Sequence, residues 1–86
     1  MTSDLYRDEA EAVRTGLEQG ALASTLANQL HQRGLGAIQI MLVFRQATGA
    51  SIPDLKAFGQ WWGLEGVTDV AAFDSWAAQV FRGVIR

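Results

Sequence analysis

Apolar side chains recur along this chain every three or four residues, a spacing that places them on one face of an α-helix. The spacing predicts five short helices, over about 4–18, 21–32, 37–48, 52–62 and 69–84. Ser3 or Asp4 is the expected N-cap of the first helix, and Thr68 that of the fifth. The connections are short and each contains glycine. The sequence therefore predicts an all-α fold, a compact bundle of about five short helices in a single domain spanning residues 1–86.

The third predicted helix is almost wholly apolar. One of its sides carries Ile38, Met41, Leu42 and Arg45, and another carries Ile40, Val43, Phe44 and Ala47. A helix that is apolar on more than one side is usually buried on more than one side, so we expect this helix to be the buried centre of the bundle. A buried strand is the alternative, because Ile, Val and Phe favour strands. The stop at Thr48-Gly49 and the helix start that follows it favour the helix.

The residues of the turn after the third helix favour the end of one helix and the start of the next. Gly49 can take the left-handed conformation that ends a helix. Ser51 is a good N-cap, and Asp54 three residues later suits the positive end of the next helix. Pro53 falls in the first turn, where its missing N–H costs nothing. The next helix then presents one apolar face, and Gly59 on that face indicates a close approach to another helix. The members of this face are Ile52, Leu55, Phe58, Gly59 and Trp62.

The segment from Arg45 to Lys56, RQATGASIPDLK, resembles the helical hairpin in the C-terminal domain of the bacterial ribosomal stalk protein. That family reads Arg-x-Ala-Thr-Gly-Leu-Gly-Leu-Lys-Glu-Ala-Lys in the same register. The matching positions are Arg45, Ala47, Thr48, Gly49 and Lys56, with Ile52 and Asp54 as conservative counterparts. The resemblance implies a bacterial, translation-linked interaction module whose hairpin presents a basic face to translation factors. It also implies an α/β domain with three strands, whereas the pattern of this chain predicts no strand.

The composition narrows the class of protein. Of the 86 residues, 49% are hydrophobic, which excludes a wholly disordered chain. The net charge of −2 argues against binding to nucleic acid or to an anionic membrane surface. The chain has no cysteine, which excludes disulfides and thiolate metal sites. The acidic, polar N-terminal segment is not a secretory signal, so we expect a small acidic protein of the cytoplasm.

The polar residues do not form a recognisable catalytic pattern. His31 is the only histidine, and we expect it to face solvent on the second helix. Asp4, Asp8 and Glu11 form an acidic face that we interpret as solvated rather than as a cation site. Ser51 is not in a nucleophile motif, and no glycine run fits a phosphate loop. We therefore expect no enzymatic activity, no cofactor and no metal.

These observations predict a non-catalytic protein that binds another protein, as an adaptor, a regulator or a toxin-neutralising partner. A homodimer is an alternative form of the same function. The residues predicted to contact the partner are Tyr6, Arg45, Lys56 and Trp61. Trp61 lies off the apolar face of its helix, so it is either covered by the fifth helix or partly exposed. A DNA-binding helix-turn-helix is a further alternative, but its recognition helix would offer only Lys56 and Gln60 as polar readers.

Overall fold

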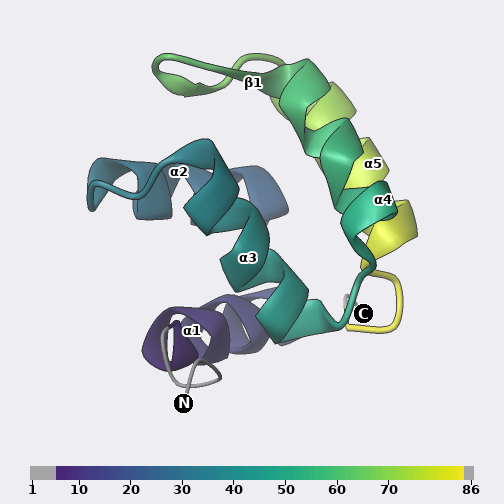
Figure 1. Ribbon diagram of the computed structural model, residues 1–86. Helices are drawn as coiled ribbons and strands as arrows, with labels where there is room; N and C mark the ends of the chain where they lie inside the picture. Colours follow the sequence, from purple (N-terminus) through teal and green to yellow (C-terminus); the bar gives the residue numbers. More distant parts are fainter. Residues whose placement is uncertain (1–5, 85–86) are drawn as a thin grey trace.

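The computed structural model describes residues 6–84. Within this range the chain is mostly α-helical and compact (Figure 1). The elements are α1 (Arg7–Glu18), α2 (Ala23–Gln32), α3 (Ala37–Thr48), α4 (Ile52–Lys56), the 3-10 helix η2 (Ala57–Trp61), β1 (Trp62–Gly63), β2 (Gly66–Val67) and α5 (Val70–Val80). The predicted five helices are therefore confirmed, but the fold is not purely all-α, because β1 and β2 pair as a small hairpin.

The helices share one hydrophobic core. Helices α1, α2 and α3 pack against one another, and α4 with η2 lies alongside α5 (Figure 1). Contacts of α2 with α5 and with β2 join the two groups. Every helix contributes buried apolar side chains. The core consists of Ala10, Val13, Leu17, Ala23, Leu26, Ala27, Leu30, Ile40, Val43, Phe44, Ala47, Leu55, Phe58, Phe73, Ala77 and Phe81.

The turn between α3 and α4 forms as predicted. Gly49 has a φ of 76°, in the left-handed region, and its N–H donates to the carbonyl of Arg45. The Ser51 hydroxyl accepts a hydrogen bond from the Asp54 N–H at 3.3 Å. The Thr48 hydroxyl donates to the Phe44 carbonyl at 2.7 Å and so closes the last turn of α3. Local chemistry is therefore sufficient to direct the chain out of one helix and into the next.

Several predicted helix ends differ from the structure. Helix α1 begins at Arg7 with Tyr6 as its N-cap, rather than at about residue 4, and the proposed caps Ser3 and Asp4 lie outside the described residues. Helix α2 begins at Ala23 rather than at Ala21. The N-cap of α5 is Asp69 rather than Thr68, since the Asp69 carboxylate accepts a hydrogen bond from the Ala72 N–H at 3.1 Å. Helix α5 ends at Val80, four residues before the predicted end at 84.

The fourth predicted helix is α-helical only as far as Lys56 and then tightens into η2. Leu55, Phe58 and Trp61 recur every three residues, which matches the period of a 3-10 helix. The tightening therefore keeps all three side chains on the side that faces the core and α5. Gly59 is exposed, and a Cβ atom added there would meet nothing within 4 Å. The expected close helix approach at Gly59 is thus wrong.

Helix α3 packs against α1, α2 and α4, but it is buried on one face rather than several. The buried face holds Ile40, Val43, Phe44 and Ala47. On the opposite side Ile38 is 72% exposed and Leu42 is 36% exposed. The expectation that both apolar sides would be covered is therefore wrong for these two residues.

The β1–β2 hairpin is held against α2 by two side chains. The Asn28 Oδ1 atom accepts a hydrogen bond from the Val67 N–H at 3.0 Å. The His31 Nε2 atom lies 3.0 Å from the Leu64 carbonyl oxygen, and because a carbonyl can only accept, Nε2 carries the proton. The His31 ring also meets Trp62 edge to face, with ring centres 5.4 Å apart. His31 is therefore half-buried beneath the hairpin, and the expectation that it faces solvent is wrong.

Candidate interaction surface

The outward face of α3 combines apolar and cationic side chains. Residues 38, 42 and 45 are spaced by four and three positions, so they share one side of the helix. This side lies opposite the core, and it carries Ile38, Leu42 and Arg45, all exposed. Met41 is half-buried beside them. An amphipathic surface helix usually has polar residues on its solvent side. Ile38 and Leu42 on the solvent side of α3 differ from that pattern, and the packing of this chain does not account for them.

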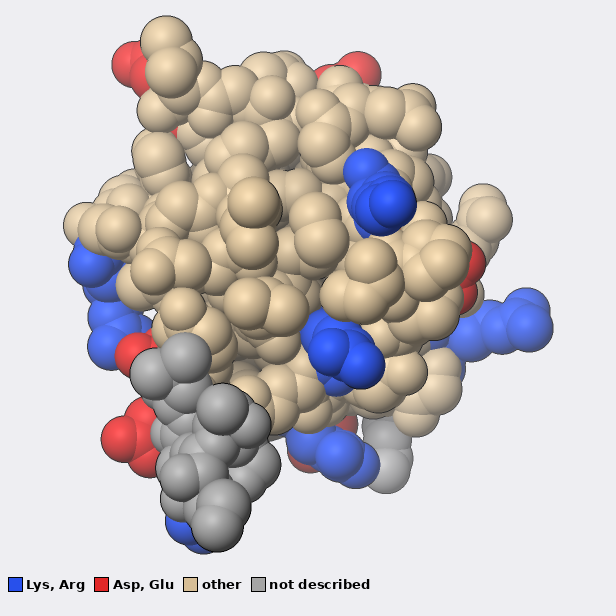
Figure 2. All heavy atoms as spheres, in the orientation of Figure 1, with Lys and Arg blue, Asp and Glu red and all other residues tan. Residues whose placement is uncertain are grey.

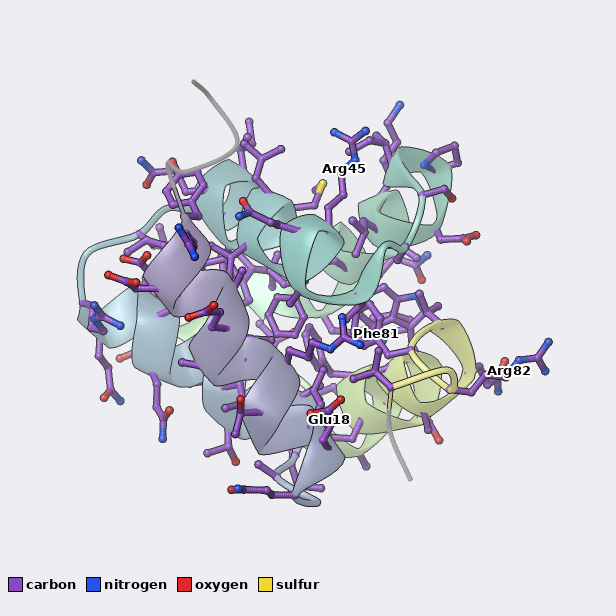
Figure 3. All side chains as sticks on the ribbon, turned by 90° about the horizontal axis from the view of Figure 1, so that it is seen from below. Glu18, Arg45, Phe81 and Arg82 are labelled. Atoms are coloured by element: carbon purple, nitrogen blue, oxygen red, sulfur yellow. The ribbon has the colours of Figure 1, made fainter. Side chains whose placement is uncertain are left out.

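Lys56 is exposed on α4, the next helix along the chain, which contacts α3. We define the α3–α4 surface as Ile38, Met41, Leu42, Arg45 and Lys56. Figure 2 shows two separate basic groups on this side, one over α3 and one over α4, with uncharged atoms between them. Arg45 and Lys56 are the sole basic residues of these two helices. In Figure 3, Arg45 points outward from α3, on the opposite side of the molecule from Glu18.

Both cations are free of ion pairs within residues 6–84. The salt bridges found there join Arg14 to Glu18 and Arg33 to Glu9. The chain contains no Asp or Glu between Glu18 and Asp54, so α2 and α3 have no carboxylate of their own. Asp54 and Lys56 are two positions apart, which separates their directions by about 200° around α4. The α3–α4 surface is consequently positive, although the whole chain has a net charge of −2.

The structure does not gather the four predicted contact residues at one place. Arg45 and Lys56 belong to the α3–α4 surface. Tyr6 is half-buried before α1, packed against the core. Trp61 is half-buried against Trp76 of α5, with ring centres 5.8 Å apart, so it is both covered by the fifth helix and partly exposed.

Sequence reasoning missed Ile38 and Leu42 as surface residues. The signal was present, because both share a helix side with Arg45, the single charged residue of α3. Because a charged side chain usually lies on the solvent side of a helix, the position of Arg45 indicates that Ile38 and Leu42 lie on the solvent side as well.

Another candidate site lies between α1 and α3. It is a shallow hollow of about 310 Å³. Its lining consists of Arg7, Ala10, Glu11, Arg14, Gln46 and Ala47. Glu11 is four residues from Arg7 and three from Arg14 on the same helix, so its carboxylate offsets the attraction that the two guanidinium groups would have for an anion. This hollow is therefore a weaker candidate than the α3–α4 surface.

Residues 6–84 contain no helix long and apolar enough to cross a membrane. The same range holds no group of three or more His, Asp or Glu side chains placed to share a metal ion. The predicted acidic face falls partly outside this range, because Asp4 is not among the described residues.

Comparisons of the whole chain with models of protein families, with curated proteins and with solved structures gave no match. The geometry and charge of the α3–α4 surface are therefore the observations that bear on function.

Proposed function

We propose that this protein is a small non-catalytic module of the cytoplasm that binds another protein through the α3–α4 surface. The observation that carries the proposal is the 72% exposure of Ile38 on the side of α3 opposite the core. Leu42 and Met41 continue the same apolar area. Burying one such side chain against a partner contributes roughly 1.5–3 kcal/mol to the free energy of binding.

The charged residues of the surface support the same proposal. Arg45 continues the line of Ile38 and Leu42 along α3, and Lys56 is exposed on the neighbouring α4; interfaces commonly combine apolar residues with polar residues at their rim. Arginine is also enriched among the residues that dominate binding energy. The non-catalytic part of the proposal rests on the sequence, which contains neither a nucleophile motif nor a phosphate-binding loop.

Site-specific photo-crosslinking in the native cell tests the proposal directly. A photoreactive phenylalanine analogue replaces Leu42 in one variant and Ala12 in a matched control. Ala12 is exposed on α1, away from the α3–α4 surface. We expect a discrete crosslinked protein from position 42 and none from position 12. Equal crosslinking at both positions, or none at position 42, contradicts the proposal.

Affinity for the captured partner gives a second test. Ile38→Asp should weaken binding by about tenfold or more, because a carboxylate then replaces a buried apolar contact. Its helix content should remain that of the unaltered protein, since Ile38 makes little contact with the core. Trp61→Ala is a less direct test, because Trp61 packs against Trp76 and its removal alters both the core and the surface.

A translation-linked module is the second candidate. It is favoured by the exposure of Arg45 and Lys56, the two cations that match the stalk-protein hairpin, on either side of a turn of the expected kind. Under this alternative, Lys56→Glu should reduce co-sedimentation of the protein with ribosomes or translation factors. Sedimentation that is absent, or unchanged by Lys56→Glu, counts against it.

A further inference from the structure

We infer that the partner presents an acidic amphipathic helix to the α3–α4 surface, and that Arg45 and Lys56 select it by charge. The inference rests on the proposed function and specifies the class of partner. It follows from the shape of this surface and from the sign of its charge. A third observation, that α1 carries no complementary surface, argues against a second copy of the chain.

The shape of the surface suits a helix. Ile38, Leu42 and Arg45 follow positions i, i+4 and i+7, so they form a straight stripe about 10 Å long, parallel to the axis of α3. Side-chain ridges of this kind pack into the grooves of a second helix. A partner strand would need an unpaired sheet edge, and β1 and β2 have two residues each. A helix is therefore the element that can cover the stripe along its whole length.

The charge of the surface selects an acidic helix. Arg45 and Lys56 are exposed and have no carboxylate partner within residues 6–84. A partner helix with an apolar stripe and Asp or Glu beside it would bury Ile38 and Leu42 and pair both cations. A basic helix with the same stripe would set like charges against each other, which strongly disfavours association.

The same reasoning argues against a second copy of this chain. Two α3–α4 surfaces placed face to face would bring four cations together. The acidic helix of the chain, α1, cannot replace the partner helix, because its exposed side chains include no large apolar residue. They are Arg7, Asp8, Glu11, Ala12, Arg14, Thr15 and Glu18. A second copy therefore cannot match both the charge and the apolar stripe of the surface through α1 or through a second α3–α4 surface.

A display library tests the charge selection. Each member presents one helix on a fixed scaffold, with leucines at i, i+3, i+4 and i+7, and with the flanking positions randomised among Glu, Gln and Lys. The library is selected against the unaltered protein and against the double variant Arg45→Glu/Lys56→Glu. Against the unaltered protein, we expect Glu to exceed Lys at the flanking positions by about fivefold, the effect of one or two exposed charge pairs. Against the double variant, the preference should reverse.

The control is the variant Ile38→Asp. It removes the apolar stripe and keeps both cations, so it should retain no member of the library. The inference is overturned by the same flanking composition in both selections, by no enrichment in either, or by retention on Ile38→Asp. A dimer in sedimentation that Ile38→Asp abolishes would also overturn it, in favour of a second copy. If crosslinking at position 42 captures a protein whose contacting segment is not acidic, this inference fails while the proposed function stands.

Discussion

Asp74 in α5 accepts two hydrogen bonds from Ser24 near the start of α2. The Ser24 backbone N–H donates to Oδ1 at 2.8 Å, and its hydroxyl donates to Oδ2 at 2.7 Å. The N-cap of α2, Leu22, has no side chain that could satisfy the free N–H groups of the first turn. Asp74 therefore caps α2 from 50 residues away, places a carboxylate at the positive end of that helix, and joins α2 to α5.

We predict a graded loss of stability when Asp74 is replaced. Asp74→Ala should lower the free energy of unfolding by about 2–3 kcal/mol, because it leaves the buried Ser24 with two unsatisfied donors. Asp74→Asn should cost less, about 1 kcal/mol, since its oxygen can still accept from the N–H and its amide can donate to a rotated hydroxyl. Urea unfolding measures both values. Glu65→Gln, at an exposed hairpin position, is the control and should stay within about 0.5 kcal/mol of the unaltered protein.

Alanine substitutions at Gly66 and Gly59 should have different effects on stability, because an added Cβ atom has no room at Gly66 and open space at Gly59. Gly66 has a φ of +103°, and an added Cβ atom would overlap the Oδ1 atom of Asn28. Gly66→Ala should therefore destabilise the protein by about 2 kcal/mol or more. Gly59→Ala, where a Cβ atom meets nothing, should be neutral or stabilising by about 0.4–1 kcal/mol. Thermal unfolding of the two variants under the same conditions compares them, and equal melting temperatures would contradict this prediction.

The link between Asn28 and Val67 should control the opening of the hairpin. Asn28→Ala removes the acceptor for the Val67 N–H, so the exchange of that amide with solvent should accelerate by about fivefold to tenfold, for a lost hydrogen bond of roughly 1 kcal/mol. Asn28→Asp keeps an acceptor oxygen and should preserve most of the protection. Amide exchange followed by NMR gives both rates, with the amide of Phe44 in α3 as the internal reference. An unchanged Val67 rate in Asn28→Ala would show that the hairpin is held by other contacts.

The stacked rings of Phe44 and Phe81 should be essential to the core. Their centres are 5.4 Å apart and both side chains are buried. Phe44→Ala should cost about 3–5 kcal/mol, a large part of the total stability of a domain of this size. We expect the far-UV circular dichroism of this variant to show substantial unfolding at 25 °C. Leu64→Ala, at a position that is 98% exposed, is the matched apolar control and should remain folded.

The periodicity of the chain was enough to predict its helices, because helix formation depends on residues three or four positions apart. The predicted range of α3 agrees with the structure at both ends, since Gln39 accepts a hydrogen bond from the Gly36 N–H at its start and Gly49 ends it in the left-handed conformation. The hairpin was missed because strands of two residues are too short to show an alternating pattern. Its stability also comes from Asn28 and His31, which lie 39 and 33 residues from their backbone partners.

The candidate surface was predictable only in part. Arg45 and Lys56 were identified from their charge in an apolar segment, but α3 is apolar on two sides, and hydrophobicity alone does not say which side meets the core. That choice depends on α1, α2 and α4, which cover the side of Ile40, Val43 and Phe44 and leave Ile38 and Leu42 outside. The sequence by itself thus determined that the chain forms five helices, and where α3 ends and α4 begins, through contacts within one or two turns. Only the tertiary structure decided which apolar face stays exposed and that Asp74 caps α2, because both depend on residues that come together when the whole chain folds.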